Sequence, residues 1–509
     1  MKKRTPRCAE AWTMIGHKAR WQFVRWEETL QSGSDGEILA LYDEAPLTPR
    51  FWATLILVYA QAAFEFFDYF LVGYLVAVLA PSWKLTYGES SIMLLSAGVG
   101  AIVGSLVFGR LADIFGRKKL LVLGGCVYPL AAGGIALLPD GAWIAFSLLR
   151  FFVGVGMAGA ITAQVPLLVE ITPTRHRPIV TGGMVVPVSL GVMLAAMSAA
   201  TLLELIGWRG IAALGTIPIV GALAIAIIVP ESVRWLLVHG RFSEARAIVA
   251  RVLKRPADSI VLPAALPPQP RKAPFRDLYG NKVRFWQISI MWTAMTTVGY
   301  CAILWGPTIL SLRLNIPVKA AAEYFVWVSL AAILGRILFT FLPLWTGRRR
   351  AGELAGYIGA LFLLGAGLFN GAYIGTLPVF FLMLIGAMFI FDGNLSNVAP
   401  YSAEIWPVQL LGRGTGLVQA CNGIGKILGP LVLAFIAGSD NLVTPKATNE
   451  AILPAFIVLT ICAVIVGLCF TLVPVDRVRT PLAMRDDEME PTTTQRGRAA
   501  RPAQARAAQ

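Results

Sequence analysis

Long apolar runs dominate this sequence and restrict what it can fold into. A helix needs about 20 mostly apolar residues to cross a bilayer. Runs of that kind predict crossings near residues 51–79, 91–108, 119–138, 143–169, 179–204 and 209–229, and again near 285–311, 320–345, 352–370, 376–399, 414–437 and 451–472. Hydrophobic residues make up 56% of the chain and charged residues 14%, a balance typical of membrane proteins. The sequence therefore predicts an all-α membrane protein with twelve transmembrane helices.

A polar stretch in the middle divides the twelve spans into two groups of six. We expect an N-terminal tail (1–50), a first bundle (51–229), a central loop (230–284), a second bundle (285–472) and a C-terminal tail (473–509). The halves echo each other, because Glu170-Ile-Thr-Pro173 follows the fourth span and Glu404-Ile-Trp-Pro407 follows the tenth. Repeated halves place a substrate site at their interface, near the membrane midplane. The expected fold is two pseudo-symmetric six-helix bundles around such a site.

The distribution of positive charge indicates the orientation of the chain. Cytoplasmic loops of membrane proteins are enriched in lysine and arginine. These residues cluster at the N-terminus, in the loop 109–119, in the central loop and at 348–350, whereas the loops expected on the other side carry few. We therefore expect both termini in the cytoplasm and the chain in the plasma (inner) membrane. The net charge of +15 follows from this topology and does not indicate a nucleic-acid partner.

Signatures of enzymes and metal sites are missing from the sequence. The six cysteines have neither metal-ligand nor redox-pair spacing. The sequence contains no recognisable pair of nucleophile and base, and no phosphate-binding loop of the type that ATP-driven pumps use. We expect no catalytic residue, no metal and no cofactor.

The segment Gly109 to Lys119, GRLADIFGRKK, connects the second and third expected spans. Its glycines, arginines and aspartate resemble the loop between helices two and three of the major facilitator superfamily of secondary transporters. Leu149 to Gly156 resembles the fourth-helix motif of that family, and Pro230 to Leu237 resembles the start of its central loop. The resemblance covers about residues 50–475. It points to the branch that contains sugar porters, organic-ion transporters and metabolite or aromatic-acid proton symporters.

The resemblance also implies a cytoplasmic gate, because this loop holds the two halves together on the inner side in that family. Asp113 would lie near the N-terminal end of span eleven, where a helix dipole favours negative charge. Arg117 would pair with Asp113, and Arg110 could reach Glu170 or another acid. The complete set of expected gate residues is Gly109, Arg110, Asp113, Gly116, Arg117, Glu170, Arg177, Glu404 and Arg413.

Two acids lie in the middle of span one, where an ionisable residue is a functional candidate by default. Glu65 and Asp68 are three residues apart and share a helix face. Two carboxylates this close in a dry site do not both ionise easily, which suits a proton carrier. Aromatic-acid proton symporters, which the chain resembles here, carry Asp-Gly-x-Asp in helix one; this chain has Glu65 and Phe66 instead of the first two residues. An alternative is that one acid pairs structurally with Arg150 and only the other carries protons.

The remaining mid-span charges are Arg150, Asp392 and Lys426. A cation facing the cavity would favour an anionic substrate, so Arg150 and Lys426 are candidate ligands. It is equally consistent with the sequence that Asp392 and Lys426 neutralise each other in a structural pair. Arg336 lies towards the inner end of span eight, and we expect it to extend to the membrane interface.

Aromatic and amide side chains supply a possible binding wall. Tyr300 and Trp305 lie in span seven, in the run GYCAILWGPTIL, which resembles the metabolite and aromatic-acid branch. Amides in other spans can orient a small ligand. The candidate substrate-binding residues are Arg150, Gln164, Tyr300, Trp305, Asp392, Asn394, Gln419, Asn422 and Lys426.

The sequence therefore predicts a secondary transporter, acting as a monomer, that moves a small anionic or aromatic metabolite together with protons by alternating access. A sugar or polyol porter of the same family is the first alternative. The glutamine-rich helix seven and the Pro-Glu-Thr-Lys-Gly ending of sugar porters are absent, which counts against it. A membrane sensor that binds a solute without moving it is the second alternative.

Overall fold

The computed structural model describes residues 38, 42, 45–260, 275–406 and 410–472. The expected C-terminal tail, most of the N-terminal tail and residues 261–274 of the central loop lie outside these ranges. The first half contains α3 (Pro49–Ser82), α4 (Tyr87–Phe115), α5 (Arg117–Ile135), α6 (Trp143–Ile171), α7 (Arg177–Gly182), α8 (Val185–Ala213) and α9 (Pro218–Ile228), followed by α10 (Val233–Val238) and α11 (Phe242–Leu253). The second half contains α12 (Lys282–Leu314), α13 (Val318–Thr346), α14 (Arg348–Leu368), the strands β1 (Tyr373–Ile374) and β2 (Leu377–Pro378), α15 (Val379–Ala387), the π-helix η5 (Met388–Asp392), α16 (Leu395–Glu404), α17 (Leu411–Ala437) and α18 (Pro445–Thr471).

The helices confirm the twelve predicted crossings. Eleven helical stretches of the described chain are long and apolar enough to span a membrane, and one of them, Thr174–Ile228, has 55 residues. At 1.5 Å per residue such a stretch is about 80 Å long, far more than one crossing needs. The chain reverses within it at Gly207, whose φ of +64° is a left-handed conformation that glycine adopts readily. The stretch therefore contributes the fifth and sixth crossings.

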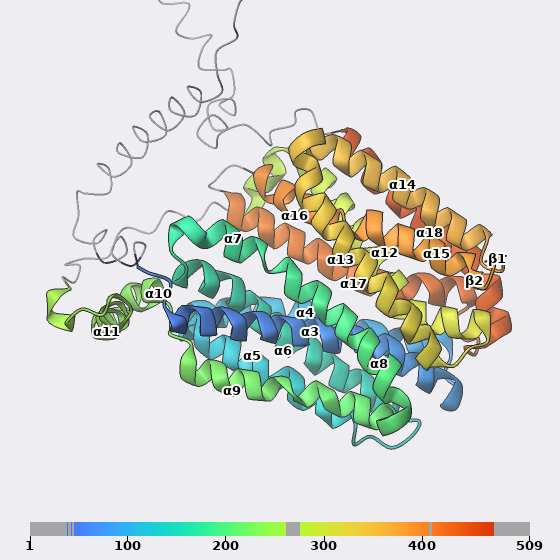
Figure 1. Ribbon diagram of the computed structural model, residues 1–509, viewed down its shortest axis with the longest axis horizontal. Helices are drawn as coiled ribbons and strands as arrows, with labels where there is room; N and C mark the ends of the chain where they lie inside the picture. The colour runs from blue at the N-terminus through green and yellow to red at the C-terminus, as the bar shows by residue number, and fades with distance from the viewer. Residues whose placement is uncertain (1–37, 39–41, 43–44, 261–274, 407–409, 473–509) are drawn as a thin grey trace, which may run out of the picture.

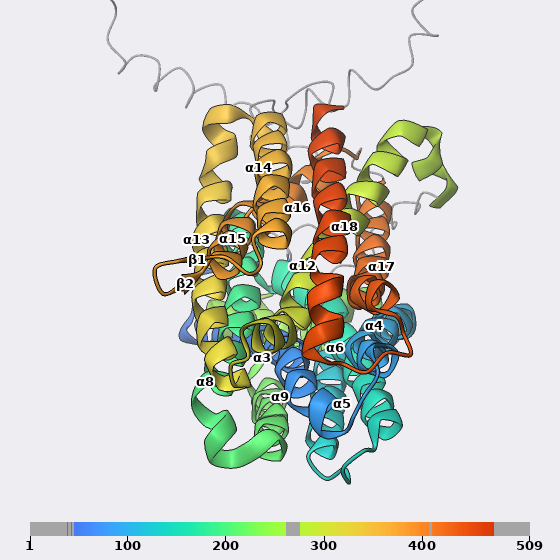
Figure 2. The ribbon, with the colours of Figure 1, turned by 90° about the vertical axis from the view of Figure 1, so that its right-hand side faces the viewer.

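The crossings form two bundles (Figure 1). In the first half α6 packs on α4 and α5, and in the second half α14 packs on α18. Figure 2 shows α5, α8 and α9 on one side of the molecule and α13, α14 and α18 on the other. Most contacts between the bundles come from three helix pairs, namely α3 with α12, α4 with α17 and α8 with α13. The α3–α12 contact needs a glycine, because a Cβ on Gly73 would lie 2.7 Å from the carbonyl oxygen of Leu304.

A second connection joins the bundles at the end that carries β1 and β2. Thr86 and Leu442 form an antiparallel bridge between the loop after α3 and the loop after α17. The bridge is flanked by backbone hydrogen bonds that run from Tyr87 N to Asn441 O (2.9 Å), from Gly88 N to Ser439 O (2.9 Å) and from Val443 N to Leu85 O (3.1 Å). We call residues 85–88 and 439–443 the loop clasp. In Figure 1 the two halves lie at an angle and come together towards this end.

Candidate functional site

The two acids of α3 have different surroundings. Asp68 forms an ion pair with Arg150 of α6, with 2.8 Å between Oδ2 and Nη1. Arg150 also donates to the backbone carbonyls of Asp68 (3.1 Å) and Tyr69 (3.2 Å). Both side chains are buried. Because a buried charge is stable only when it is paired or hydrogen-bonded, the structure places Arg150 as the partner of Asp68.

Glu65 has no cationic partner among the described residues. Its side chain is completely buried, and Oε1 accepts a hydrogen bond of 2.5 Å from Nε2 of Gln164. Gln164 is one of the substrate-binding residues predicted from the sequence. The other carboxyl oxygen, Oε2, has no hydrogen-bond partner in the described chain. One turn earlier, Gln61 donates to the hydroxyl of Tyr128. Glu65 therefore lies in a small polar shell of amides and one phenol, without an opposite charge.

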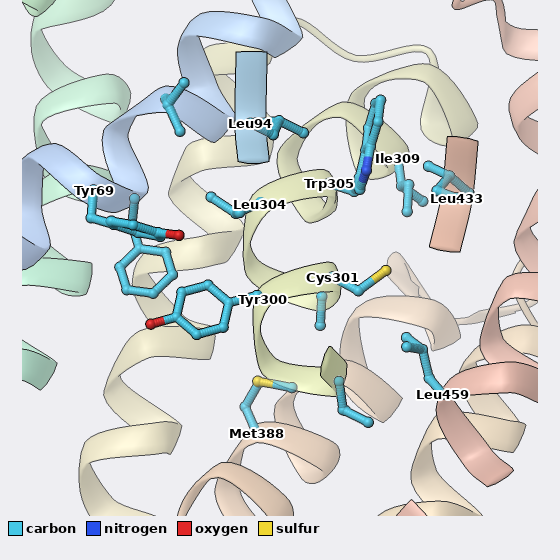
Figure 3. Close-up of a cluster of buried hydrophobic side chains, with 14 of the residues drawn as sticks. Tyr69, Leu94, Tyr300, Cys301, Leu304, Trp305, Ile309, Met388, Leu433 and Leu459 are labelled. Atoms are coloured by element: carbon cyan, nitrogen blue, oxygen red, sulfur yellow. The ribbon is translucent and has the colours of Figure 1, made fainter. Parts of the chain in front are cut away.

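Lys426 lies against aromatic rings from both halves. Its Nζ is 5.2 Å from the ring centroid of Tyr69 on α3 and 5.5 Å from that of Tyr300 on α12. The two rings pack edge to face, 5.3 Å apart. Figure 3 shows Tyr69 beside Tyr300, whereas Trp305 lies on the other side of α12. Among the described residues Lys426 has no ion pair. Cation–π contacts therefore hold this ammonium group at the interface of the bundles.

Asp392 does not pair with Lys426, so the predicted alternative of a structural Asp392–Lys426 pair is wrong. Oδ2 of Asp392 lies 3.0 Å from both Nε and Nη2 of Arg336. The expectation that Arg336 extends to the membrane interface is also wrong, since the residue is only 7% exposed. Its Nη1 donates to the hydroxyl of Ser189 in the other half, at 2.8 Å. Two nearby acceptors therefore keep Arg336 inside the protein.

The other predicted ligands lie in different settings. Asn422 is one turn before Lys426 on α17 and shares its face; its Oδ1 has no hydrogen-bond partner in the described chain. Trp305 is fully buried and donates to the carbonyl of Pro430, towards the loop clasp. Asn394 is buried and accepts from Asn397, and Gln419 is exposed. Asn422 therefore shares the Lys426 face, whereas the contacts of Trp305 and Asn394 lie elsewhere.

The loop between α4 and α5 builds the predicted network only in part. Arg117 lies 3.5 Å from Asp113 and 3.5 Å from Glu170, so Arg117 and not Arg110 reaches Glu170. Arg110 is exposed because α4 continues to Phe115 and keeps it on an outer face. The chain turns at Gly116, which has a φ of +102°, and this turn brings Arg117 back towards α6.

Two residues of the central segment fix this loop, and the sequence prediction missed their contacts. Glu231 accepts the backbone N–H of Lys118 at 3.1 Å, at the positive N-terminal end of α5. The indole of Trp235 donates to the carbonyl of Asp113 at 3.0 Å.

The remaining predicted gate residues are spread along the same region. Arg177 donates to the carbonyl of Thr172, Gly109 and Arg413 are exposed, and Arg348 binds Glu404 through two contacts of 2.6 and 2.8 Å. In the second half, the Arg348–Glu404 pair thus occupies the place that Arg117–Glu170 has in the first. Each of these pairs lies within one bundle.

Comparisons with known proteins agree with the fold. The model of the Major Facilitator Superfamily matches residues 58–430. The niacin transporter NiaP of Acinetobacter baylyi is 26% identical over 411 residues, which cover 79% of this chain and 90% of that protein. The 4-hydroxybenzoate transporter PcaK of Pseudomonas aeruginosa is 25% identical over 420 residues, with the same two coverages.

Solved structures share the same architecture. The inward open conformation of the xylose transporter XylE from E. coli has a TM-score of 0.66 at 16% identity, covering 87% of this chain and 100% of that one. A bacterial homolog of the human lysosomal transporter Spinster, in an inward-facing and occupied conformation, has a TM-score of 0.65 at 16% identity, covering 84% and 97%. At these identities the likeness concerns the fold.

Proposed function

This chain belongs to the Major Facilitator Superfamily, and from that premise we propose that it transports a small aromatic or other organic acid together with protons, by alternating access. Its relatives are named as transporters of niacin, 4-hydroxybenzoate, gallate and cis,cis-muconate. All four compounds are carboxylic acids with a planar, unsaturated skeleton. A site for them needs one cation and aromatic or apolar walls.

The observation that carries this proposal is the position of Lys426. It is a cation inside the bundles with no ion pair in the described chain, and it lies between rings that belong to different halves. A substrate carboxylate bound there would supply the missing opposite charge, and its ring would contact Tyr69 and Tyr300. Arg150 is a weaker candidate, because Asp68 already neutralises it. A sugar has no charge to offer Lys426, which disfavours the alternative of a sugar porter.

The two acids of α3 support proton coupling. Glu65 is buried without a cation, and its Oε2 has no partner in the described chain. A proton on this oxygen removes the cost of a buried negative charge. Asp68 is paired with Arg150 and would take a proton only when that ion pair opens. We therefore assign the coupling proton to the pair, with Glu65 as the resting carrier.

Orientation follows from the positive charges. We place the end with α10, the loop Gly109–Lys119 and Arg348 to Arg350 in the cytoplasm, with both termini there, and the chain in the plasma membrane as a monomer. The loop clasp then lies on the outer side, where it joins the two halves. The Arg117–Asp113–Glu170 network of the first half and the Arg348–Glu404 pair of the second half then lie on the inner side.

Binding of a charged and a neutral analogue tests the role of Lys426. Radiolabelled uptake of aromatic acids, nicotinate and sugars at two external pH values first identifies the substrate. If nicotinate is bound, Lys426→Ala should weaken its binding about 10- to 100-fold, the usual worth of a charged hydrogen bond, and should change nicotinamide binding little. Lys446→Ala, at an exposed position of α18, is the control. Accumulation of sugars alone, or equal losses for both analogues, would contradict the proposal.

A further inference from the structure

We propose that Arg336 and Asp392 form a second polar subsite, which recognises an uncharged hydrogen-bonding group at the end of the substrate opposite its carboxylate. This inference rests on the proposed function, because it takes the carboxylate to be bound at Lys426. It adds a determinant of specificity and predicts which organic acids the chain prefers.

A small cavity lies beside the pair, and Arg336 and Asp392 are among the residues that line it. Its walls come from both halves: Ser189 and Val192 belong to α8, and the remaining lining residues belong to α12, α13 and η5. Most of them are apolar, so the polar groups of Arg336, Asp392 and two serines stand out. The cavity therefore lies at the bundle interface, where a transported solute has to pass.

Helix α12 connects the cavity with the Lys426 region. Ile303 lines it and lies three residues after Tyr300, on the same helix face. Lys426 contacts the ring of Tyr300. A planar acid with its carboxylate at Lys426 would therefore run past Tyr300 with its far end directed towards the cavity.

The backbone geometry of α13 and η5 allows Arg336 and Asp392 to approach each other. A Cβ on Gly335 would lie within 2 Å of the carbonyl oxygen of Phe389, so only glycine allows α13 to approach η5 here. Asp392 ends a π-helical turn, Met388–Asp392, and such turns occur frequently at functional sites. The turn and the glycine contact together bring Asp392 within 3.0 Å of Arg336.

The charges of the pair determine what it can bind. Arg336 and Asp392 neutralise each other, so the subsite as a whole carries no net charge. Arginine has five N–H donors, and the Asp392 side chain is still 13% exposed. The pair can thus donate to and accept from a phenolic hydroxyl. A second carboxylate would meet the negative charge of Asp392 and be disfavoured.

Three ligands that differ only at the far end test the subsite: benzoate, 4-hydroxybenzoate and terephthalate, measured by binding to the purified full-length protein. The wild type should bind 4-hydroxybenzoate about tenfold more tightly than the other two, since one good hydrogen bond is worth about that factor. Asp392→Asn leaves Arg336 with an uncompensated charge and should shift the preference about tenfold towards terephthalate. Asp140→Asn removes the carboxylate partner of Arg209 at an exposed position outside the cavity lining, and it should leave the three affinities in their wild-type ratios.

A second variant covers the case in which Asp392→Asn fails to insert. Arg336→Met with Asp392→Leu replaces the pair by apolar side chains, which buried ion pairs often tolerate, and should abolish the preference for 4-hydroxybenzoate over benzoate. If wild type binds benzoate and these variants leave the ratios unchanged, the subsite is wrong while the proposed function stands. If the wild type binds none of the three but takes up another organic acid, the subsite is wrong while the proposed function stands. If it takes up no organic acid at all, the proposed function itself fails, and the subsite with it.

Discussion

Four charged side chains inside the bundles are paired, and two have no opposite charge in the described chain. Asp68 has Arg150, and Asp392 has Arg336. Glu65 and Lys426 have only neutral or aromatic neighbours among the contacts described above. A buried charge without a partner destabilises a membrane protein, so it persists where a function needs it. A proton for Glu65 and a carboxylate for Lys426 are the partners that a symporter would bring.

Replacing each acid of α3 by its amide distinguishes loss of proton coupling from loss of substrate binding. Glu65→Gln should abolish accumulation driven by a pH gradient, because an amide cannot carry the proton, whereas exchange of internal for external substrate should persist. Asp68→Asn should also stop accumulation, and it leaves Arg150 unpaired. Transport of radiolabelled substrate into proteoliposomes measures both modes, with Glu450→Gln, at an exposed position, as control. Continued accumulation in both acid variants would show that the coupling proton is carried elsewhere.

Among the elements, the loop clasp is the part of the interface whose movement can be tested most simply. A Cβ on Gly88 would lie 3.4 Å from the Cβ of Ser439, close to the spacing of a disulfide. Gly88→Cys with Ser439→Cys should therefore cross-link on oxidation. In the proposed orientation substrate enters from the side of the clasp, so the cross-link should block accumulation, and reduction should restore it.

The single-cysteine variants are the controls for this experiment, because they keep the native cysteines and cannot form the new bridge. Formation of the cross-link, checked by mass spectrometry, without any loss of transport would contradict an outer gate at the clasp.

The helices were predictable from the sequence, whereas several of their contacts were not. Apolar length alone predicts a crossing, because an unpaired backbone cannot remain in lipid. The fate of Arg336 depends instead on Gly335, which lets α13 approach η5, and on a π-helical turn that shifts Asp392 away from the 3.6-residue period. Gly335 is visible in the sequence beside Arg336, but neither the close helix contact that it allows nor the π-helical turn can be derived from the order of amino acids.

The same limit applies to the gate loop. The motif Gly109 to Lys119 predicted that its arginines would pair with acids, and Arg117 does so. Which arginine reaches Glu170 depends on where α4 ends and on the turn at Gly116, and a boundary error of a few residues exchanges Arg110 for Arg117. Pairing of Asp68 with Arg150 was one of two alternatives that the sequence left open, and only the packing of α3 on α6 distinguishes them.

At the scale of the whole molecule, we interpret these features as parts of one transport cycle. The bundles are joined at the loop clasp, Lys426 lies at their interface, and the ion pairs of Arg117 and Arg348 lie on the proposed inner side. A carboxylate at Lys426 and a proton on Glu65 would together remove both unpaired charges, which lowers the cost of moving the loaded site through the closed state. A transporter that has bound only one of the two keeps one unpaired buried charge, so substrate and proton should move together.

Accumulation in proteoliposomes is the direct test of proton-coupled transport of an organic acid. Purified protein is reconstituted, and uptake of the labelled acid identified in the panel is followed with and without an imposed inward proton gradient. We expect the labelled acid to accumulate above its external concentration when the gradient is imposed. Without the gradient, or after addition of a protonophore, it should only equilibrate. Equal uptake under all three conditions, or accumulation that follows another ion, would contradict proton-coupled transport of an organic acid by this chain.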